Sequence, residues 1–259
     1  MDSEKYLLHA KLNIFQEKVR LTRDFMVGCE AQYGPLALSV SWGKDSLVMA
    51  HLARDLSLPY VWLSCGEFDD WPDTEEVAER FCKRWPVKVH KVGCMSVAEC
   101  YRTAGRFYVF AETQEQKKAD RLYSDSFIET ITGTIRDMGC KGSFIGLRAE
   151  ESRGRLRLLR FRGRLLYSKT HRLWECFPLA WWTGRDIWAY IFAYDIPYSE
   201  MYDLYPDREK ARNGAMFAAT IPNIGGMDTY FGQFALLKRH YPELFNRFAA
   251  EFPEVRCYV

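Results

Sequence analysis

The stretch of the chain best suited to chemistry runs from Leu36 to Ser46 and reads LALSVSWGKDS. An apolar run ends there in small hydroxyl residues and one glycine, and the residues that follow, Leu47 to Ala53, have helical composition. This order predicts a strand, a tight turn and a helix. Such a turn presents backbone N–H groups and a helix N-terminus to one point in space, which is a geometry that binds phosphate. We therefore expect the loop to hold the phosphate end of a nucleotide.

Two other interpretations compete for this loop. A Walker A loop needs a glycine five residues before Gly43 and a Ser or Thr directly after the lysine. Those positions hold Leu38 and Asp45 instead. The other interpretation is an ordinary turn whose hydroxyl groups only cap the following helix. Six residues do not decide between function and capping, so the rest of the chain must.

The composition is that of a globular chain, with 259 residues of which 48% are hydrophobic. This length allows one sizeable core. The 36 basic and 34 acidic residues leave a net charge of +2, which by itself indicates no polyanionic partner. The N-terminus shows no apolar signal core, and no run reaches membrane-spanning length. We therefore expect a cytoplasmic protein with no membrane partner.

The cysteines fit the same compartment as free thiols. They form no C-x-x-C pair, so their spacing matches neither a zinc finger nor a standard iron–sulfur pattern. A metal held by cysteines that the fold brings together is the less favoured interpretation. The eight cysteines stand at positions 29, 65, 82, 94, 100, 140, 176 and 257.

The residues around the loop predict a parallel sheet. A second buried strand runs from Leu58 and ends at the small residues Ser64–Gly66, a helix spans about Glu75 to Arg84, and a third strand covers Val87–Val92. This order implies parallel strands with right-handed crossovers. Ligands of such sheets bind at the carboxyl ends of the strands, where both the loop and Ser64–Gly66 would lie.

A fourth strand, from Ser143, delivers the charged segment Arg148–Arg153 to the same edge. Arginine presents a planar fork that suits phosphate or sulfate oxygens, so Arg148 or Arg153 could neutralise a polyphosphate or hold a second anionic substrate. The alternative is a solvated charge cluster paired internally by Glu150 and Glu151. The position directly after a buried strand favours the functional interpretation.

The next segment is rich in arginine, and Leu156–Phe161 and Arg164–Tyr167 look like two short strands around a turn. A basic hairpin of this kind could lie along nucleic acid. It could equally be an exposed ribbon beside an anionic cleft, and the near-neutral total charge favours the ribbon.

Other segments predict structure without chemistry. Glu4–Met26 has the apolar spacing of one amphipathic helix, with Leu8 and Leu12 on its apolar stripe, and Thr183 with Asp186 forms a helix N-cap signal. The remaining predictions are a short extended insert at Arg106–Phe110, a helix over Glu112–Arg136, and two or three C-terminal helices from Asp207 that are interrupted at Pro222, Gly225–Gly226 and Pro242.

Taken in order, these segments resemble the phosphoadenylyl-sulfate (PAPS) reductase family within the PP-loop, or adenine-nucleotide α-hydrolase, superfamily. The resemblance covers roughly residues 35–205. Its four matching segments are Ser41–Ser46, Cys65–Gly66 with Trp71–Thr74, Gly146–Arg153, and Pro178–Trp188 followed by Ile196–Tyr198.

The resemblance implies an α/β fold with a Rossmann-like (HUP-type), mostly parallel sheet flanked by helices. It implies one domain over residues 1–259, with a core at about 30–205 and a helical C-terminal region at about 206–259. It also implies an adenine nucleotide across the strand ends, and Mg²⁺ with the phosphates when the nucleotide is ATP. The metal would be bound through the ATP phosphates, with Asp45 as the candidate protein ligand.

The resemblance assigns residue roles as well. Lys44, Asp45 and Arg148 are the candidate catalytic residues, and Cys65 with Gly66 would border the adenosine. The full set of candidate nucleotide-binding residues is Ser39, Ser41, Trp42, Gly43, Lys44, Asp45, Ser46, Ser64, Cys65, Gly66, Gly146, Arg148 and Arg153.

The chain departs from the reductases of this family at the catalytic cysteine. Those reductases carry it in a C-terminal Glu-Cys-Gly-Leu-His motif, whereas Cys257 here lacks the following glycine and histidine. The sequence Lys44-Asp45-Ser46 looks closer to the ATP-using members. The leading hypothesis is therefore an enzyme that cleaves the α–β bond of ATP, by adenylyl transfer or by hydrolysis to AMP and pyrophosphate.

Two alternatives stay open at this point. The first is a sulfonucleotide reductase that uses Cys257 as its nucleophile. The second is a non-catalytic nucleotide- or nucleic-acid-binding subunit, with a nucleic acid or a protein complex as the partner of Arg153–Arg172. It rests on analogy with relatives of the family found in phage and mobile-element defence loci.

Overall fold

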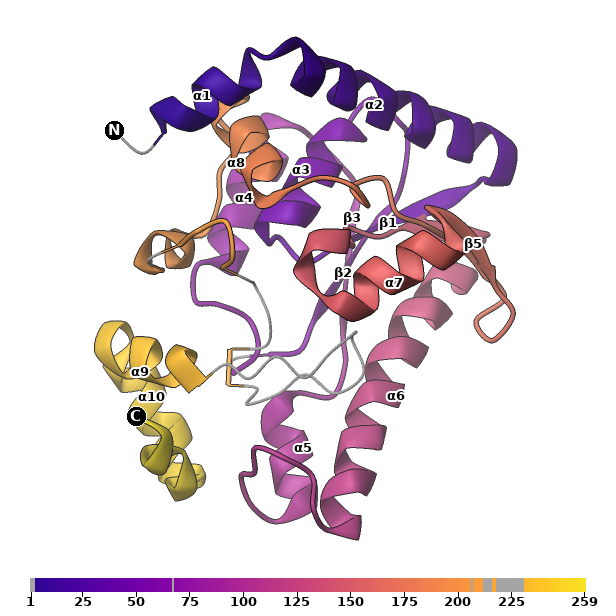
Figure 1. The fold of residues 1–259 in the computed structure, drawn as a ribbon. Coiled ribbons are helices and arrows are strands. Elements are labelled where there is room, and N and C mark those ends of the chain that lie inside the picture. The colour runs from indigo at the N-terminus through magenta and orange to yellow at the C-terminus, as the bar shows by residue number, and fades with distance from the viewer. Residues whose placement is uncertain (1–2, 67, 206, 212–215, 218–230) are drawn as a thin grey trace. The chain divides into compact units, whose positions relative to one another are not determined.

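The computed structural model describes residues 3–66, 68–205, 207–211, 216–217 and 231–259. The chain divides into two compact units (Figure 1). The first unit contains residues 1–63, 73–92 and 131–212, and the second contains residues 64–72, 93–130 and 213–259. The single domain over residues 1–259 stays a prediction.

A six-stranded sheet has the order β3-β2-β1-β4-β6-β5. Three pairs are parallel, β1 with β2, β1 with β4 and β4 with β6, whereas β5 runs antiparallel to β6. The predicted α/β fold with a mostly parallel sheet is confirmed. The strands are β1 Leu36–Val40, β2 Tyr60–Ser64, β3 Val89–Gly93, β4 Gly142–Phe144, β5 Leu165–Ser168 and β6 Leu173–Cys176.

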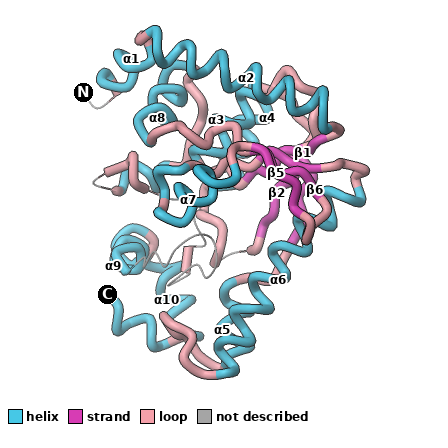
Figure 2. The backbone as a smooth tube through the Cα atoms, turned by 45° about the vertical axis from the view of Figure 1, so that its right-hand side comes forward, coloured by secondary structure: helices cyan, strands magenta, loops and turns pink. Residues whose placement is uncertain are grey.

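Strand β1 lies inside the sheet, between β2 and β4. Figure 2 shows the strands gathered together, in magenta. Leu36, Ala37 and Leu38 are all fully buried, as expected for a parallel strand with both faces covered. Its register pairs Leu38 with Tyr60 on one side and with Phe144 on the other. The residues after β1 therefore start from the middle of the carboxyl edge of the sheet.

The helices alternate with the strands through the first unit and dominate the second. Among the helices that the structure describes, none combines the length and apolar composition needed to span a bilayer. The α-helices are α1 Glu4–Ala10, α2 Asn13–Tyr33, α3 Lys44–Leu52, α4 Thr74–Arg84, α5 Val97–Ala104, α6 Gln114–Asp137, α7 Arg153–Arg162, α8 Gly184–Ala193, α9 Phe231–His240 and α10 Pro242–Glu251, and the 3₁₀ helices are η1 Ala149–Glu151, η2 Glu200–Leu204 and η3 Pro253–Tyr258.

Helix α3 is buried almost all round and packs against β1 and α8. This explains its apolar composition, which shows little helical periodicity. Its one imidazole, on His51, is 3% exposed and lies 3.0 Å from the Tyr190 hydroxyl, measured from Nδ1 to the oxygen. The indole of Trp85 packs edge-on against the same ring. The helix that begins at the loop is thus held inside the protein over its whole length.

The expected single helix over Glu4–Met26 is wrong, because the structure has two helices with a break at Lys11–Leu12. Leu8 and Leu12, which fit the apolar spacing, are 60% and 48% exposed. Helix α1 instead buries Tyr6 and Ala10 and packs on α8, where the Tyr6 ring stacks on Phe192. Phe15, Val19 and Met26 of the predicted stripe are buried in α2, so the stripe is wrong only at Leu8 and Leu12.

The expected arginine-rich hairpin is also wrong in its first half. Leu156–Phe161 belongs to helix α7, and only the second half is a strand, β5. The Ser152 side chain caps α7 by accepting a hydrogen bond from the Arg155 amide at 3.2 Å, and Gly163, at a positive φ of 77°, ends the helix. The alternation of Arg and Leu is typical of a strand and led to the wrong prediction. The Ser152 cap and the terminal Gly163 favour a helix instead.

Most of the other predicted elements are confirmed. Thr183 and Asp186 form a capping box at the start of α8, and the Asp186 carboxylate also binds His9 and Lys18, each at 2.7 Å. The helix predicted over Glu112–Arg136 is α6. Arg106–Phe110 forms no strand in the part of the chain that the structure describes. Helices α9 and α10 confirm a helical C-terminal region, with Pro242 opening α10, while Pro222 and Gly225–Gly226 lie outside the described residues.

The second unit has an aromatic core. The Phe217 and Phe248 rings stack with centroids 4.0 Å apart, and Tyr101 and Phe107 pack around them. The buried Asp69 carboxylate accepts hydrogen bonds from the Val97 amide at 2.9 Å and the Tyr123 hydroxyl at 3.2 Å. Burial raises the pKa of Asp69 to about 7. This carboxyl group therefore takes up a proton near neutral pH.

The buried imidazole of α3 makes stability depend on pH. Burial, reinforced by Arg54, lowers the pKa of His51 to about 3, whereas an unfolded histidine titrates near about 6.5. Below about pH 6.5 the imidazole is protonated in the unfolded chain but stays neutral in the folded chain. The free energy of unfolding therefore falls by about 1.4 kcal/mol for each unit by which the pH is lowered. The contribution is fully present above about pH 6.5 and is lost progressively toward pH 3.

Between pH 7 and pH 5, we expect the free energy of unfolding of His51→Gln to fall by about 2 kcal/mol less than that of the parent, as measured by urea unfolding. Asp69 titrates in the same range, but it is common to both proteins and cancels in the difference. His240→Gln, at an exposed histidine, is the matched control. Equal losses in the parent and in His51→Gln would show that His51 takes up its proton in the folded protein.

Candidate functional site

The loop Ser41–Ser46 connects β1 to α3, as the sequence predicts. Trp42 has a positive φ of 58°, which is uncommon for a residue other than glycine. Its indole is 1% exposed and packs edge-on against Trp62 and at a tilt against Phe81. Packing therefore holds the left-handed backbone that turns the chain into α3. Trp42 supports the loop from the core rather than facing solvent.

Hydrogen bonds within the loop fix its shape. The Ser46 hydroxyl donates to the Gly43 carbonyl oxygen at 3.0 Å and accepts from the Ser41 amide at 3.2 Å. The Lys44 amide donates to the Tyr202 hydroxyl at 3.0 Å. The next amides of α3, those of Asp45 and Ser46, find no acceptor among the described residues. They give the positive end of α3 two N–H groups that an anion can use.

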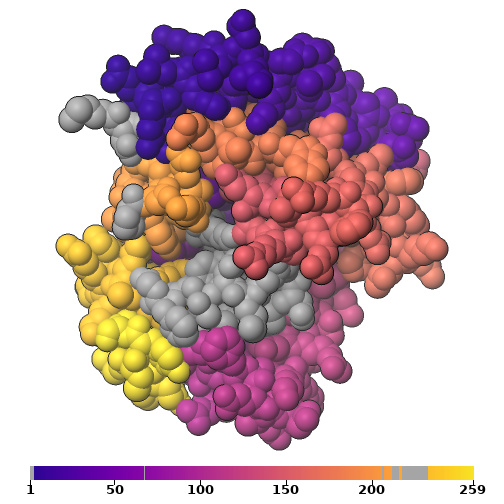
Figure 3. Space-filling model, in the orientation of Figure 1, coloured from indigo at the N-terminus to yellow at the C-terminus, as the bar shows by residue number. Residues whose placement is uncertain are grey.

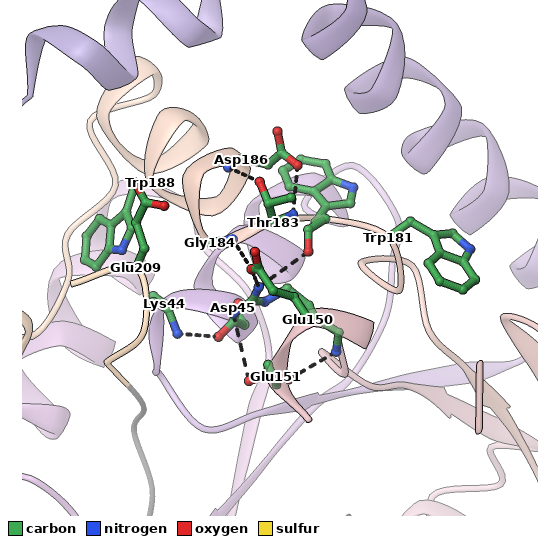
Figure 4. A network of polar contacts seen from close by, with 12 residues as sticks. Lys44, Asp45, Glu150, Glu151, Trp181, Thr183, Gly184, Asp186, Trp188 and Glu209 are labelled. Atoms are coloured by element: carbon green, nitrogen blue, oxygen red, sulfur yellow. Dashed lines mark hydrogen bonds and ion pairs between the residues drawn. The ribbon is translucent and has the colours of Figure 1, made fainter. Parts of the chain in front are cut away.

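Two buried cations meet on one carboxylate beside this helix start. Lys44 Nζ lies 2.9 Å from Asp45 Oδ2, and Arg148 Nε lies 2.6 Å from Asp45 Oδ1. Figure 4 shows the Lys44–Asp45 pair with Glu150 and Glu151 beside it. The Lys44 and Arg148 side chains are 1% and 2% exposed. A buried charge is stable only when it is paired, so Asp45 holds both cations in place.

Two glutamates complete the network around Arg148. Its Nη1 lies 2.9 Å from Glu150 Oε2, and its Nη2 lies 3.9 Å from Glu151 Oε1. Glu150 also accepts a hydrogen bond from the Gly184 amide at 2.5 Å, at the start of α8, and Glu151 pairs with Arg155. The internal pairing considered for this segment thus exists, around a buried arginine, with Glu151 nearly buried and Glu150 half-exposed.

The network sets the protonation states at the loop. Burial raises the pKa of Asp45, but the charges of Lys44 and Arg148 outweigh burial and leave that pKa below its ordinary value. Burial lowers the pKa of Arg148, and Asp45 together with the glutamates more than reverses this. The site therefore holds an ionised carboxylate between two charged cations at neutral pH.

Tyr202 is a residue of the site that the sequence analysis missed. Besides accepting from the Lys44 amide, its ring lies below the Lys44 ammonium, with Nζ 5.5 Å from the ring centroid. Burial and the Asp45 charge raise the pKa of Tyr202, so the phenol keeps its proton. The tyrosine lies 158 positions from Lys44 along the chain. It follows the family-matching segment Ile196–Tyr198, but no pattern marks the tyrosine itself, and the fold brings it to the site.

Gly146 lies against the loop. A methyl group added to it would be 3.6 Å from the Ser46 amide nitrogen and 3.7 Å from Asp45 Cβ. The first unit therefore brings Gly146 and Arg148 together with Lys44, Asp45 and Ser46. Ser39 lies on β1 next to Val61, and Arg153 is exposed at the start of α7.

Ser64 ends β2, Cys65 and Gly66 follow it, and all three belong to the second unit. The Ser64 hydroxyl donates to Asp70 at 2.6 Å, and the Gly66 carbonyl accepts from the amides of Asp69 and Asp70. Contact with the Cys94 thiol, with burial, raises the pKa of Cys65, so this thiol is not an activated nucleophile. The contact of these residues with an adenosine stays a prediction.

Metal ligands are few at the loop. Within the described ranges, no group of three or more His, Cys, Asp and Glu side chains could hold a metal ion. The ionised Asp45 carboxylate is one anionic oxygen ligand at the place where a phosphate tail would end. This fits Mg²⁺, which keeps several waters and is commonly bound by one or two carboxylates plus substrate phosphates.

Comparison with known proteins defines the family. The sequence model of the phosphoadenosine phosphosulfate reductase domain matches residues 35–229, a range that includes the loop, Arg148 and Tyr202. The chain belongs to this family. The resemblance inferred from the sequence is thereby confirmed.

The relatives are distant. The phosphoadenosine 5'-phosphosulfate reductase of Xanthomonas axonopodis pv. citri is 26% identical over 189 residues, which cover 71% of this chain and 73% of that protein. The reductase of that name from Synechococcus is 24% identical over 65% of this chain and 69% of its own length.

Solved structures show the same fold. The PAPS reductase of Candida auris, in a phosphate complex, has a TM-score of 0.54 at 15% identity and covers 71% of this chain and 84% of that chain. The U34-tRNA thiolase NcsA from Methanococcus maripaludis, with its [4Fe-4S] cluster, has a TM-score of 0.52 at 16% identity, over 94% of this chain and 76% of that chain. At these identities the likeness supports the Rossmann-like PP-loop fold alone.

The buried pairing around Asp45 predicts a large stability effect. Replacing Asp45 by Asn leaves Lys44 and Arg148 without their shared carboxylate, and breaking a buried pair in this way costs about 3–5 kcal/mol. We expect a loss of that size in the free energy of unfolding, measured by urea denaturation. Asp24→Asn removes a carboxylate that is 58% exposed and also bound to arginine, so it should change stability by less than about 1 kcal/mol. Equal effects of the two substitutions would contradict the buried network.

Proposed function

We propose that this chain binds ATP by its triphosphate at the loop Ser41–Ser46 and cleaves the bond between the α and β phosphates. The adenylyl group passes to an acceptor, or to water to give AMP and pyrophosphate. The observation that carries the proposal is the meeting of two buried cations, Lys44 and Arg148, on Asp45 beside the open amides of α3. An ammonium group, an arginine fork and helix amides are all donors to phosphate oxygens.

The chain's own groups have defined tasks in such a reaction. An acceptor oxygen attacks the α phosphorus, the bond from that phosphorus to the bridging oxygen breaks, and pyrophosphate leaves with the electron pair. Lys44 and Arg148 neutralise the charge that develops on the leaving group. Because Asp45 and Tyr202 already hold Lys44 in place, its ammonium group needs little rearrangement when the charge forms.

Charge balance supports a role for magnesium. The network contains three cations, Lys44, Arg148 and Arg155, and three carboxylates, on Asp45, Glu150 and Glu151, so its formal charges cancel. A neutral network does not offset a triphosphate. Mg²⁺ bound through the phosphates, with Asp45 as its protein ligand, would supply the missing charge and polarise the α phosphate.

Three further assignments belong to this proposal. Ser64, Cys65 and Gly66 border the adenosine, and Arg153 binds a second, anionic substrate. The location is the cytoplasm, which the eight free thiols support.

A reductase is the second candidate, because the relatives at 24–26% identity carry that name. In this mechanism the Cys257 thiolate attacks the sulfur of a sulfonucleotide and expels the nucleotide. A dithiol reductant then releases sulfite from the thiosulfonate and restores the thiol. Cys257 is exposed on η3, which makes the attack sterically accessible.

We expect ATP labelled at the α phosphate, incubated with the protein and Mg²⁺, to yield labelled AMP or a labelled acceptor together with pyrophosphate. Lys44→Met, which keeps the side-chain stem and removes the charge, should lower the rate at least 100-fold, in the range of removing one transition-state donor. Lys83→Met, at an exposed lysine of α4, should leave the rate unchanged. Circular dichroism checks that both variants are folded.

Other products separate the candidates. ADP and phosphate as the only products would overturn the proposal. Sulfite release from a sulfonucleotide and a dithiol, abolished by Cys257→Ser, would establish the reductase instead. ATP binding in calorimetry without any turnover would indicate a nucleotide-sensing subunit.

A further inference from the structure

The positive charge of this chain is concentrated in one segment. Residues 152–174 contain eight of the 36 basic residues and none of the 34 acidic ones. The rest of the chain therefore has 28 basic and 34 acidic residues, and is acidic overall. The near-neutral net charge of the whole chain does not reveal this uneven distribution. A local cluster of basic residues is typical of a surface that binds a polyanion.

Helix α7 presents three of these eight basic residues on one face. At 3.6 residues per turn, Arg153, Arg157, Arg160 and Phe161 fall within an arc of about 100°. All four are exposed, and Phe161 is 84% exposed. The opposite face packs into the protein, where Leu159 is 1% exposed in a cluster with Ala149, Phe177 and Ala180. The basic face is thus not needed to hold the helix in place.

This basic face lacks internal partners. Among the α7 arginines that the structure describes, Arg155 alone pairs with a carboxylate, that of Glu151. Exposed arginines elsewhere do pair, such as Arg20 with Glu17 and Arg102 with Glu251. The neighbouring arginines of this face repel one another, and a nearly fully exposed phenylalanine lies among them. Neither feature is expected of a surface that contacts only solvent.

The composition of the face selects the class of partner. Arginines at intervals of about one helical turn, or about 5.4 Å, suit a row of phosphates. An exposed aromatic ring among them is a stacking platform for an unpaired base. A membrane surface would need an apolar face, but the leucine side of α7 is buried in the protein. Figure 3 shows the atoms of this segment, in salmon, on the face turned toward the viewer.

We propose that α7, with Lys169 and Arg172 beyond β5, binds single-stranded nucleic acid. Arg157 and Arg160 contact phosphates, and one base stacks on Phe161. This goes beyond the proposed ATP reaction, and the contacting residues Arg157, Arg160 and Phe161 are not among those that carry it. Binding is therefore independent of the loop.

The test is fluorescence anisotropy with labelled 20-nucleotide oligo(dT) and oligo(U), titrated over a range of salt concentrations. We expect binding to at least one of the two. Arg157→Glu combined with Arg160→Glu should weaken it at least tenfold and reduce the salt slope by about 1.4, because each phosphate contact on a single strand contributes about 0.7. Phe161→Ala should weaken it by roughly 5- to 150-fold, the range of one base stacked on an aromatic ring.

The control with matched charge is Lys117→Glu combined with Lys118→Glu, on the exposed start of α6, which should bind as the parent does. Lys44→Met should also bind the oligonucleotides as the parent does. The binding test therefore stays decisive even if the proposed ATP reaction is wrong. Equal losses in the two double variants would overturn the proposal, as would unchanged binding by Phe161→Ala. Absence of oligonucleotide binding, or binding to anionic vesicles alone, would overturn it as well.

Discussion

The ionised carboxylate of Asp45 lies between the ammonium group of Lys44 and the guanidinium group of Arg148, and all three side chains depend on one another. Without that carboxylate the buried Lys44 would lose the ion pair that the described residues give it, and Arg148 would keep only Glu150 and Glu151. The ion pair between Asp45 and Arg148 also connects the start of α3 to the segment after β4, and these two segments lie far apart in the sequence. Because the cations are held at a helix N-terminus with open amides, the same arrangement that stabilises the first unit also prepares it for an anion.

The sheet explains why this arrangement forms where it does. Strand β1 lies between β2 and β4, so the loop after β1 and the segment after β4 leave the sheet at one edge. The family model of the phosphoadenosine phosphosulfate reductase domain covers both the loop after β1 and the segment after β4. Arg148 is soon followed in the chain by the exposed α7 arginines Arg153, Arg157, Arg160 and Arg162, so one short stretch supplies both a buried cation and a basic surface.

The sequence predicted the elements whose signals are local. The loop, the mostly parallel sheet, α6 and the Thr183–Asp186 cap were all correct, because strand length, helical composition and capping residues act over a few positions. The failures came where tertiary contacts decided. The N-terminal helix broke because Tyr6 and Ala10 pack on α8, and α7 formed where alternating Arg and Leu imitated a strand. At the site, Lys44, Asp45 and Arg148 were foreseen from motifs, whereas Tyr202 was not, since it reaches the loop only through the fold.

The most direct test of the account is a crystal structure with Mg²⁺ and an ATP analogue whose α–β bridge is a methylene group. We expect a phosphate within hydrogen-bonding distance of the Ser46 amide, with its oxygens contacting Lys44 Nζ and the Arg148 guanidinium. An analogue bound elsewhere, with Lys44 still paired to Asp45 and Arg148 still paired to Asp45, Glu150 and Glu151, would contradict the central claim that this buried charge network is an anion receptor.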